Sequence, residues 1–181
     1  MKKLFCTFLI LLSGLVLFSL LPTKPLNEDL LLISQQLKRF SSEFQNSKYS
    51  ILIDYDKPFF RKRLWVIQNS TKEVILNCHV SHAWKSGFFV PTQFSNIPES
   101  KISCKGVFKT LYSYESNYGH GDLKIGMRIN GLEKQNNNAL KRNIVFHSSY
   151  GPWSSGCFMT FPTVNKQIID FTKNGSMVIV R

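Results

Sequence analysis

A histidine and a cysteine ten residues apart carry the chemistry of this chain. His147 follows the apolar run 144–146, and Cys157 follows Ser155 and Gly156. A free thiol ionises near pH 8.5, so it is a weak nucleophile at neutral pH unless a nearby imidazole takes its proton. Glycine before the cysteine permits a tight turn that points backbone amides at a developing oxyanion. The segment therefore predicts nucleophilic acyl transfer; a buried free cysteine beside an unrelated histidine is the alternative.

The elements that must position these two residues are mostly strands. Loop-forming glycines, prolines and serines fill 81–103. A short helix is predicted from Thr163 to Lys173, capped by the threonine and ended by Gly175. Apolar and alternating runs predict strands at 51–55, 63–68, 73–80, 105–114, 122–129, 143–147 and 177–180. We expect a mostly β domain, a sheet or sandwich, with the histidine at the end of one strand.

The N-terminus differs in kind from the rest of the chain. Lys2 and Lys3 precede Leu4–Leu21, an uncharged run of 18 residues. That length can just cross a bilayer. No Ala-x-Ala cleavage site follows, so we expect an uncleaved anchor helix with its lysines in the cytoplasm; a cleaved signal peptide is the alternative. Either assignment exports the remainder to the cell envelope, on the periplasmic side of the inner membrane.

Three regions follow from these patterns. We expect residues 1–24 to form the signal anchor or signal peptide, residues 25–47 an amphipathic linker helix, and residues 48–181 the domain that carries the histidine and the cysteine. The helix is predicted from Asn27 to Gln45 because apolar residues recur at a helical spacing. These residues are Leu26, Leu30, Ile33, Leu37, Phe40 and Phe44.

The net charge of +12 limits the kinds of partner that the domain can bind. The densest basic cluster is Lys57, Arg61, Lys62 and Arg63, which we expect on the solvated surface. A basic exported domain is attracted to anionic envelope polymers or lipid headgroups. Nucleic acid is excluded as a partner because the sequence has no nucleic-acid-binding motif beside its positive charge.

Three cysteines lie beyond the N-terminal run, and an odd number flags at least one free thiol. A Cys78–Cys104 disulfide would leave Cys157 free. A simply buried Cys78 is the alternative. No spacing of histidines and cysteines fits a zinc site, and the predicted chemistry needs no metal or organic cofactor.

Taken in order, these pieces resemble a known family, the L,D-transpeptidase catalytic (YkuD-type) domain, in its murein L,D-transpeptidase branch. The His-Ser … Ser-x-Gly-Cys pattern carries the resemblance, with a short helix and a terminal strand after it. Residues 138–147 match the branch's N-x-A-x-x-R-x-I-V-x-H stretch. Weaker matches lie at 81–82, 93–108, 118–125 and 130–133, so the likeness runs from about Ile51 to Val180.

Two departures stand out. The segment between histidine and cysteine is shorter than the branch usually has. Met159 stands where many relatives carry arginine or asparagine. The shorter segment bears on substrate choice more than on the chemistry. Together with the missing polar residue at Met159, it also motivates a non-catalytic alternative.

The resemblance implies a role for each residue of the motif. Cys157 attacks an acyl carbon and forms a thioester, and His147 is the general base. The backbone carbonyl of Ser148 orients the imidazole, and the amides of Gly156 and Cys157 stabilise the oxyanion. Candidate substrate-binding residues are Ser154, Tyr150, Trp153, Asn96, His82 and His120. Turn formation, aromatic packing and loop scaffolding are the alternatives for these six.

The implied activity is transfer of a peptidoglycan stem peptide to an amine acceptor. Water as acceptor would make the protein an L,D-carboxypeptidase. Two other classes remain open: a non-catalytic cell-wall-binding module, and a sortase-like acyltransferase. The sortase-like interpretation has little support, because the Thr-Leu-x-Thr-Cys stretch of sortases is absent and the only arginine after the cysteine is Arg181.

Overall fold

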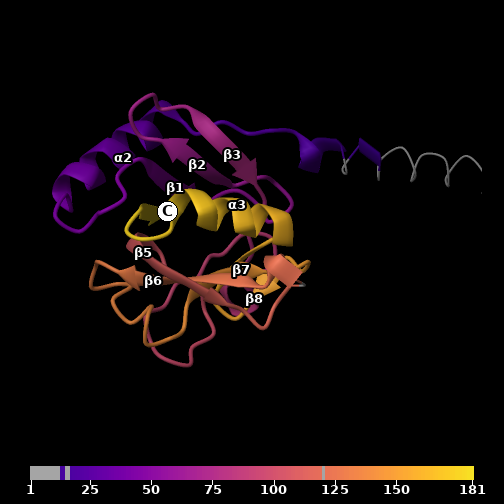
Figure 1. Ribbon diagram of the computed structural model, residues 1–181. Helices are drawn as coiled ribbons and strands as arrows, with labels where there is room; N and C mark the ends of the chain where they lie inside the picture. The colour runs from indigo at the N-terminus through magenta and orange to yellow at the C-terminus, as the bar shows by residue number, and fades with distance from the viewer. Residues whose placement is uncertain (1–12, 15–16, 120) are drawn as a thin grey trace, which may run out of the picture.

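The computed structural model describes residues 13–14, 17–119 and 121–181, and Figure 1 shows how its elements are arranged. Most of the regular structure is β, as the sequence predicts. The strands are β1 (Tyr49–Ile53), β2 (Leu64–Gln68), β3 (Val74–Cys78), β4 (His82–Ala83), β5 (Gly106–Glu115), β6 (Ile125–Gly131), β7 (Val145–Ser148), β8 (Trp153–Ser154), β9 (Phe158–Thr160) and β10 (Met177–Val180). The helices are α2 (Asn27–Arg39) and α3 (Pro162–Thr172), with short 3-10 turns at Trp84–Ser86 and Gly121–Leu123.

Eight strands form one sheet in the order β3-β2-β1-β10-β5-β6-β7-β9, and β4 pairs with β8 in a small second sheet. Most neighbours are antiparallel, but β1 with β10 and β7 with β9 are parallel. A parallel pair needs a long connection between its strands. Here residues 149–157 connect β7 to β9, and this predicted histidine–cysteine loop contains β8, which pairs with β4 in the second sheet.

The central strands are buried on both faces, which explains their continuous apolar runs. Side chains of a strand alternate between the faces. In β1, Ile51 and Ile53 join one apolar cluster and Leu52 joins the other. Helix α3 contributes Ile168 and Ile169 to the first cluster. Figure 1 places α3 between the β1–β3 part of the sheet and the β5–β7 part.

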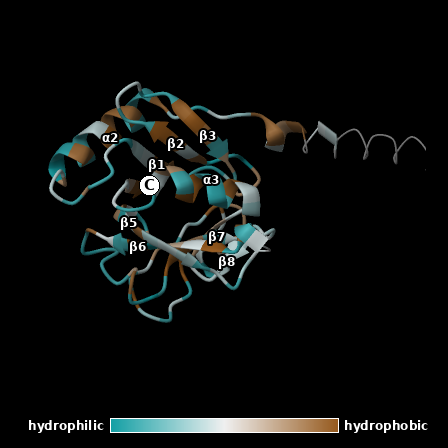
Figure 2. Ribbon diagram, viewed as in Figure 1, coloured by the Kyte–Doolittle hydropathy of each residue, from teal (hydrophilic) through white to brown (hydrophobic). Residues whose placement is uncertain are grey.

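Helix α2 covers the second cluster, where Ile33 is fully buried. Its alternating hydrophilic and hydrophobic bands are visible in Figure 2. The helix begins at Asn27 as predicted but ends at Arg39, six residues before the predicted Gln45. Two serines follow Phe40, and serine competes with helical hydrogen bonds through its own side chain. Phe44 is nevertheless buried in the cluster. The helical spacing of apolar residues therefore identified a residue that packs in the core although it lies beyond the end of the helix.

The segment before α2 is attached to the domain. Thr23 accepts a hydrogen bond from the indole of Trp65 and bonds the side chain of Asn77. Most of the predicted anchor, Leu4–Leu21, lies outside the described residues. Within the part that is described, no helix is long and apolar enough to cross a membrane.

Candidate active site

His147 and Cys157 come together through the parallel pair β7–β9. Phe146 lies opposite Phe158 in the register, so the histidine follows one member of this pair and the cysteine precedes the other. Both residues line one pocket of about 470 Å³. The rest of its wall is Trp84, Tyr118, Ser149, Trp153, Ser154, Ser155 and Met159. Strand pairing therefore brings the predicted base and nucleophile to one hollow at the sheet edge.

The imidazole of His147 is held in one tautomer. Its Nδ1 lies 3.1 Å from the carbonyl oxygen of Ser148, which can only accept, so Nδ1 carries the proton and Nε2 is left as the base. The ring of Tyr118 stacks on the imidazole with centroids 4.4 Å apart. Burial lowers the pKa of His147 and outweighs the opposing effect of the Ser148 hydrogen bond. The imidazole is therefore neutral at pH 7 and able to accept a proton.

The thiol of Cys157 is half-buried and protonated in this conformation. It donates to the carbonyl oxygen of Asn143 over 3.5 Å, and among the described residues no hydrogen bond joins it to His147. Burial raises the pKa of Cys157, while the backbone of Val145 and the charge of Arg142 oppose the rise. The resting pair is thus thiol and neutral imidazole, and the thiol must change its hydrogen-bond partner before the proton moves.

Gly156 makes the turn that presents the cysteine. Its φ of 128° lies in a region that side-chain-bearing residues rarely adopt. A methyl group built there would lie 2.7 Å from Cδ1 of Ile144. The amide of Gly156 donates to Oγ of Ser154 over 3.0 Å, which stabilises the turn. In this conformation the Gly156 amide is therefore engaged with the Ser154 hydroxyl. Of the two amides predicted as oxyanion donors, the amide of Cys157 is then the remaining candidate.

We expect Gly156→Ala to lower activity sharply. The added methyl must displace Ile144 and adopt a disfavoured φ, at a cost of about 1–3 kcal/mol. Relief of that strain moves the neighbouring sulfur, and small misplacements of reacting atoms cost about 10²-fold in rate. The measurement is the rate of acyl-enzyme formation, with the thermal midpoint recorded alongside it. Gly151→Ala is the matched control, because an added methyl there meets only Oγ of Ser149 at 3.9 Å. Equal rates for both variants would contradict the prediction.

His82, predicted as a substrate contact, lies in the protein interior. Its Nε2 donates to the carbonyl of Gly87 and its Nδ1 accepts from the guanidinium of Arg63, each over 2.7 Å. Burial lowers its pKa to about 4, and Arg63 adds to that effect. The ring holds the loop after β4 in place and is absent from the pocket wall. This arrangement matches the scaffolding alternative.

The basic cluster predicted on the surface includes one residue that is fully buried. Arg63 is 0% exposed. Its guanidinium donates to the carbonyls of Val80 and Lys57 and lies 4.9 Å from the ring centroid of Tyr55. Arg63 thereby links β2 to the segment that leads into β4.

Of the other predicted substrate-binding residues, some line the pocket and some lie outside it. Trp153 and Ser154 line the pocket. Asn96 bonds Lys134, Asn137 and Asn138, which ties two loops together away from the pocket. Tyr150 is 72% exposed and packs edge-on against Phe161 in a neighbouring hollow. His120 lies outside the described residues.

The thiols of Cys78 and Cys104 are both free and buried, so no disulfide joins them.

Tyr118 and Trp84 are pocket residues that the sequence reasoning did not assign. Tyr118 lies in the matched stretch 118–125, but only the three-dimensional stack on His147 reveals its contact. Trp84 reaches the pocket because His82 and Ala83 pair with Trp153 and Ser154. That bridge spans about seventy residues of sequence, and two-residue strands leave no periodic pattern.

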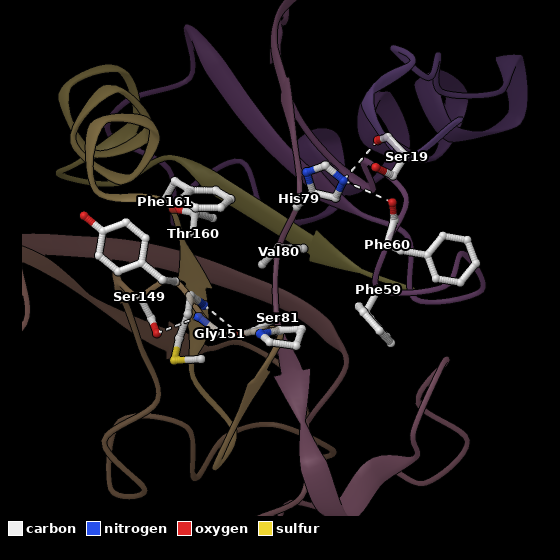
Figure 3. Close-up of a pocket in the computed structure, with 13 residues that line it drawn as sticks. Ser19, Phe59, Phe60, His79, Val80, Ser81, Ser149, Gly151, Thr160 and Phe161 are labelled. Carbon is white, nitrogen blue, oxygen red and sulfur yellow. Dashed lines mark hydrogen bonds between the residues drawn. The ribbon is translucent and has the colours of Figure 1, made fainter. Parts of the chain in front are cut away.

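A second hollow of about 210 Å³ adjoins the first and shares Ser149 and Met159 with it. Figure 3 shows Phe59, Phe60 and His79 on one side and Thr160 and Phe161 on the other. Nε2 of His79 bonds the carbonyl of Ser19 or Phe60, each over 3.1 Å. The lining is mostly apolar.

Comparison with known proteins places the chain in a family. Residues 26–180 match the family model described as the L,D-transpeptidase catalytic domain. The chain belongs to this L,D-transpeptidase (YkuD) family, as the motif order predicts. No curated protein sequence matches it.

Solved structures of L,D-transpeptidases are among the chains similar to this one. The L,D-transpeptidase of Xylanimonas cellulosilytica gives a TM-score of 0.50 at 13% identity, with 76% of this chain and 62% of that chain covered. The enzyme of Stackebrandtia nassauensis gives 0.47 at 15% identity, covering 82% and 64%. That of Mycobacterium smegmatis gives 0.47 at 13%, covering 75% and 59%. This chain spans less than two thirds of each of these three chains.

Proposed function

We propose that this protein is a peptidoglycan L,D-transpeptidase that uses Cys157 as its nucleophile. One observation carries the proposal: Nδ1 of His147 is fixed on the Ser148 carbonyl, and this imidazole shares a pocket with the only thiol of the described residues that is not buried. Membership of the family supports peptidoglycan as the substrate.

In the first half-reaction the sulfur attacks the carbonyl carbon that precedes the terminal D-amino acid of a donor stem. His147 takes the thiol proton and passes it to the leaving amine. A carbon–sulfur bond forms and the carbon–nitrogen bond breaks. The amide of Cys157 faces the charge that develops on the carbonyl oxygen, where one such donor contributes about 3 kcal/mol.

In the second half-reaction an acceptor amine attacks the thioester. His147, neutral again, removes the proton of the amine, and the sulfur leaves as a thiolate that regains this proton. A second stem, another protein or a free D-amino acid are acceptors of the right chemistry. Because the lowered pKa of His147 keeps it neutral at pH 7, it is ready for both half-reactions.

We also propose that the domain works outside the cytoplasmic membrane, attached through the apolar run at 4–21. Support comes from the sequence: two lysines precede an uncharged run, and the run ends at Pro22. Thr23, which follows the run, donates its backbone N–H to the side chain of Asn77 in β3.

The test is intact-protein mass spectrometry of the full-length chain in detergent. Incubation with a carbapenem, which by family resemblance acylates the nucleophile, should add one adduct to wild type and none to Cys157→Ala. Incubation with purified sacculi should yield cross-linked muropeptides with wild type alone.

Three outcomes separate the alternatives. An adduct on both proteins, or on neither with unchanged muropeptides, would refute the proposal and leave a wall-binding module. Shortened stems without new cross-links would identify an L,D-carboxypeptidase. New cross-links that depend on Cys157 support the transpeptidase.

A further inference from the structure

Arg142 is a half-buried cation without a counter-ion. Its guanidinium, in the turn before β7, donates to the carbonyls of Ser95 and Ile102 and to Oγ of Ser100. All three acceptors are neutral. None of the ion pairs found across the described residues includes Arg142. Since removing a charge from water is costly unless an opposite charge compensates it, this position favours a nearby anion.

The guanidinium lies against the turn that carries the nucleophile. A methyl group built on Gly156 would be 3.7 Å from Nη2 of Arg142 and 3.6 Å from the carbonyl oxygen of Ile102. Cys157 is the next residue along the chain. The charge of Arg142 opposes the rise that burial imposes on the pKa of Cys157, and it acts in the same direction on Cys104.

Arg128, which donates to Oδ1 of Asn143, is a second cation near the sulfur. The other titratable groups that interact with Cys157 are uncharged at pH 7. Burial raises the pKa values of Tyr55, Cys104 and Tyr114, each of which interacts with Cys157. Across the pocket, His147 is neutral because burial lowers its pKa. Helix α3 begins at Pro162, five residues after the cysteine, and a helix dipole fades beyond the first turn.

We propose that Arg142 is a positioning residue that stabilises the thiolate of Cys157, supplying from the turn before β7 the positive charge that β9 lacks. The idea rests on the proposed function, in which the sulfur must become anionic each time His147 takes its proton. Arg142 fixes the 95–102 loop through three hydrogen bonds, so its charge is held at a constant place relative to the turn at Gly156. When the thioester forms, the negative charge leaves the sulfur and the guanidinium keeps its neutral acceptors.

The experiment measures alkylation of Cys157 by iodoacetamide in the full-length protein, from about pH 5.5 to about pH 10. Peptide mapping scores Cys78 and Cys104 separately. For Arg142→Gln we expect the apparent pKa of Cys157 to rise by about one unit, and alkylation at pH 7 to slow about tenfold. Arg142→Lys should stay within about half a unit of wild type, because the charge remains.

Two controls separate charge from loop structure. Lys141→Gln removes a positive charge from the adjacent exposed residue, and Ser100→Ala removes one hydrogen bond of Arg142 while its charge remains. Both should leave the apparent pKa unchanged. A purely structural role would change the thermal midpoint in Ser100→Ala and Arg142→Gln without moving the pKa of Cys157.

An unchanged pKa in a folded Arg142→Gln protein would overturn the inference. If that variant does not fold, a shift of a full unit in Arg142→Lys would overturn it instead. Alkylation needs no peptidoglycan, so this result is independent of the carbapenem and muropeptide assays. A shifted pKa in a protein that gives neither a carbapenem adduct nor changed muropeptides would refute the transpeptidase and retain the charge assignment.

Discussion

His147→Ala should reduce the rate of Cys157 acylation about 10³-fold at pH 7, because a positioned general base contributes about 10² to 10⁴ in rate. Without the imidazole the thiol must ionise unaided, and burial raises its pKa. The measurement is the rate of carbapenem adduct formation by mass spectrometry. In the variant, the rate should climb with pH up to the alkaline range where the thiol itself ionises.

The acid side of the wild-type profile follows from the direction of the His147 shift. The base must be neutral to act, and burial lowers its pKa below the ordinary 6.5. Activity should therefore persist below pH 6.5 and decline only at lower pH. His79→Ala is the matched control, because His79 lies outside the pocket that holds Cys157 and should leave the profile unchanged. A variant His147→Ala with the wild-type rate and profile would exclude the histidine as the base.

Arg63→Ala should lower the free energy of unfolding by about 3–5 kcal/mol, because it leaves several buried acceptors unpaired at about 1–3 kcal/mol each. Arg63 is fully buried, and its loss leaves the carbonyls of Val80 and Lys57 and Nδ1 of His82 without their donor. It also leaves a cavity beside Tyr55. A domain with a typical stability of about 5–15 kcal/mol would lose much of it. Urea unfolding of the full-length protein measures the change.

Lys62→Ala is the control for Arg63, since Lys62 is the neighbouring cation and is only half-buried, and its loss should cost about 0.5 kcal/mol. A loss under about 1 kcal/mol in Arg63→Ala would show that water or neighbouring groups replace the guanidinium. Titration of His82 by NMR tests independently whether the contact with Arg63 has been lost. Its pKa, lowered to about 4 by burial with Arg63 adding to the effect, should rise in the variant.

Most of the fold was predictable because its central strands have long apolar runs. The runs at 51–55, 63–68 and 177–180 coincide with β1, β2 and β10 to within two residues. Residue type and spacing also predict the chemistry that we propose for the histidine and cysteine segment. The pocket that they share did not, because it depends on the parallel pairing of β7 with β9.

What the sequence could not supply were contacts that only folding creates. Strands β8 and β9 have two and three residues, too few for an alternating pattern. Arg63 belongs to a basic cluster typical of a solvated surface, and only the carbonyls around it make burial tolerable. His82 follows a serine in a matched stretch, yet its ring is occupied by Gly87 and Arg63. Local composition does not specify such distant partners.

The position of β10 has a consequence for how the chain reaches its native state. This last strand lies in the middle of the sheet, between β1 and β5, and its parallel partner Tyr49–Ile53 is more than a hundred residues earlier. Contacts so distant in sequence slow folding, because the loop between them must close first. A nascent polypeptide cannot complete the sheet until residues 177–180 have left the ribosome. Until then the unpaired edges of β1 and β5 remain open to chaperones or to aggregation.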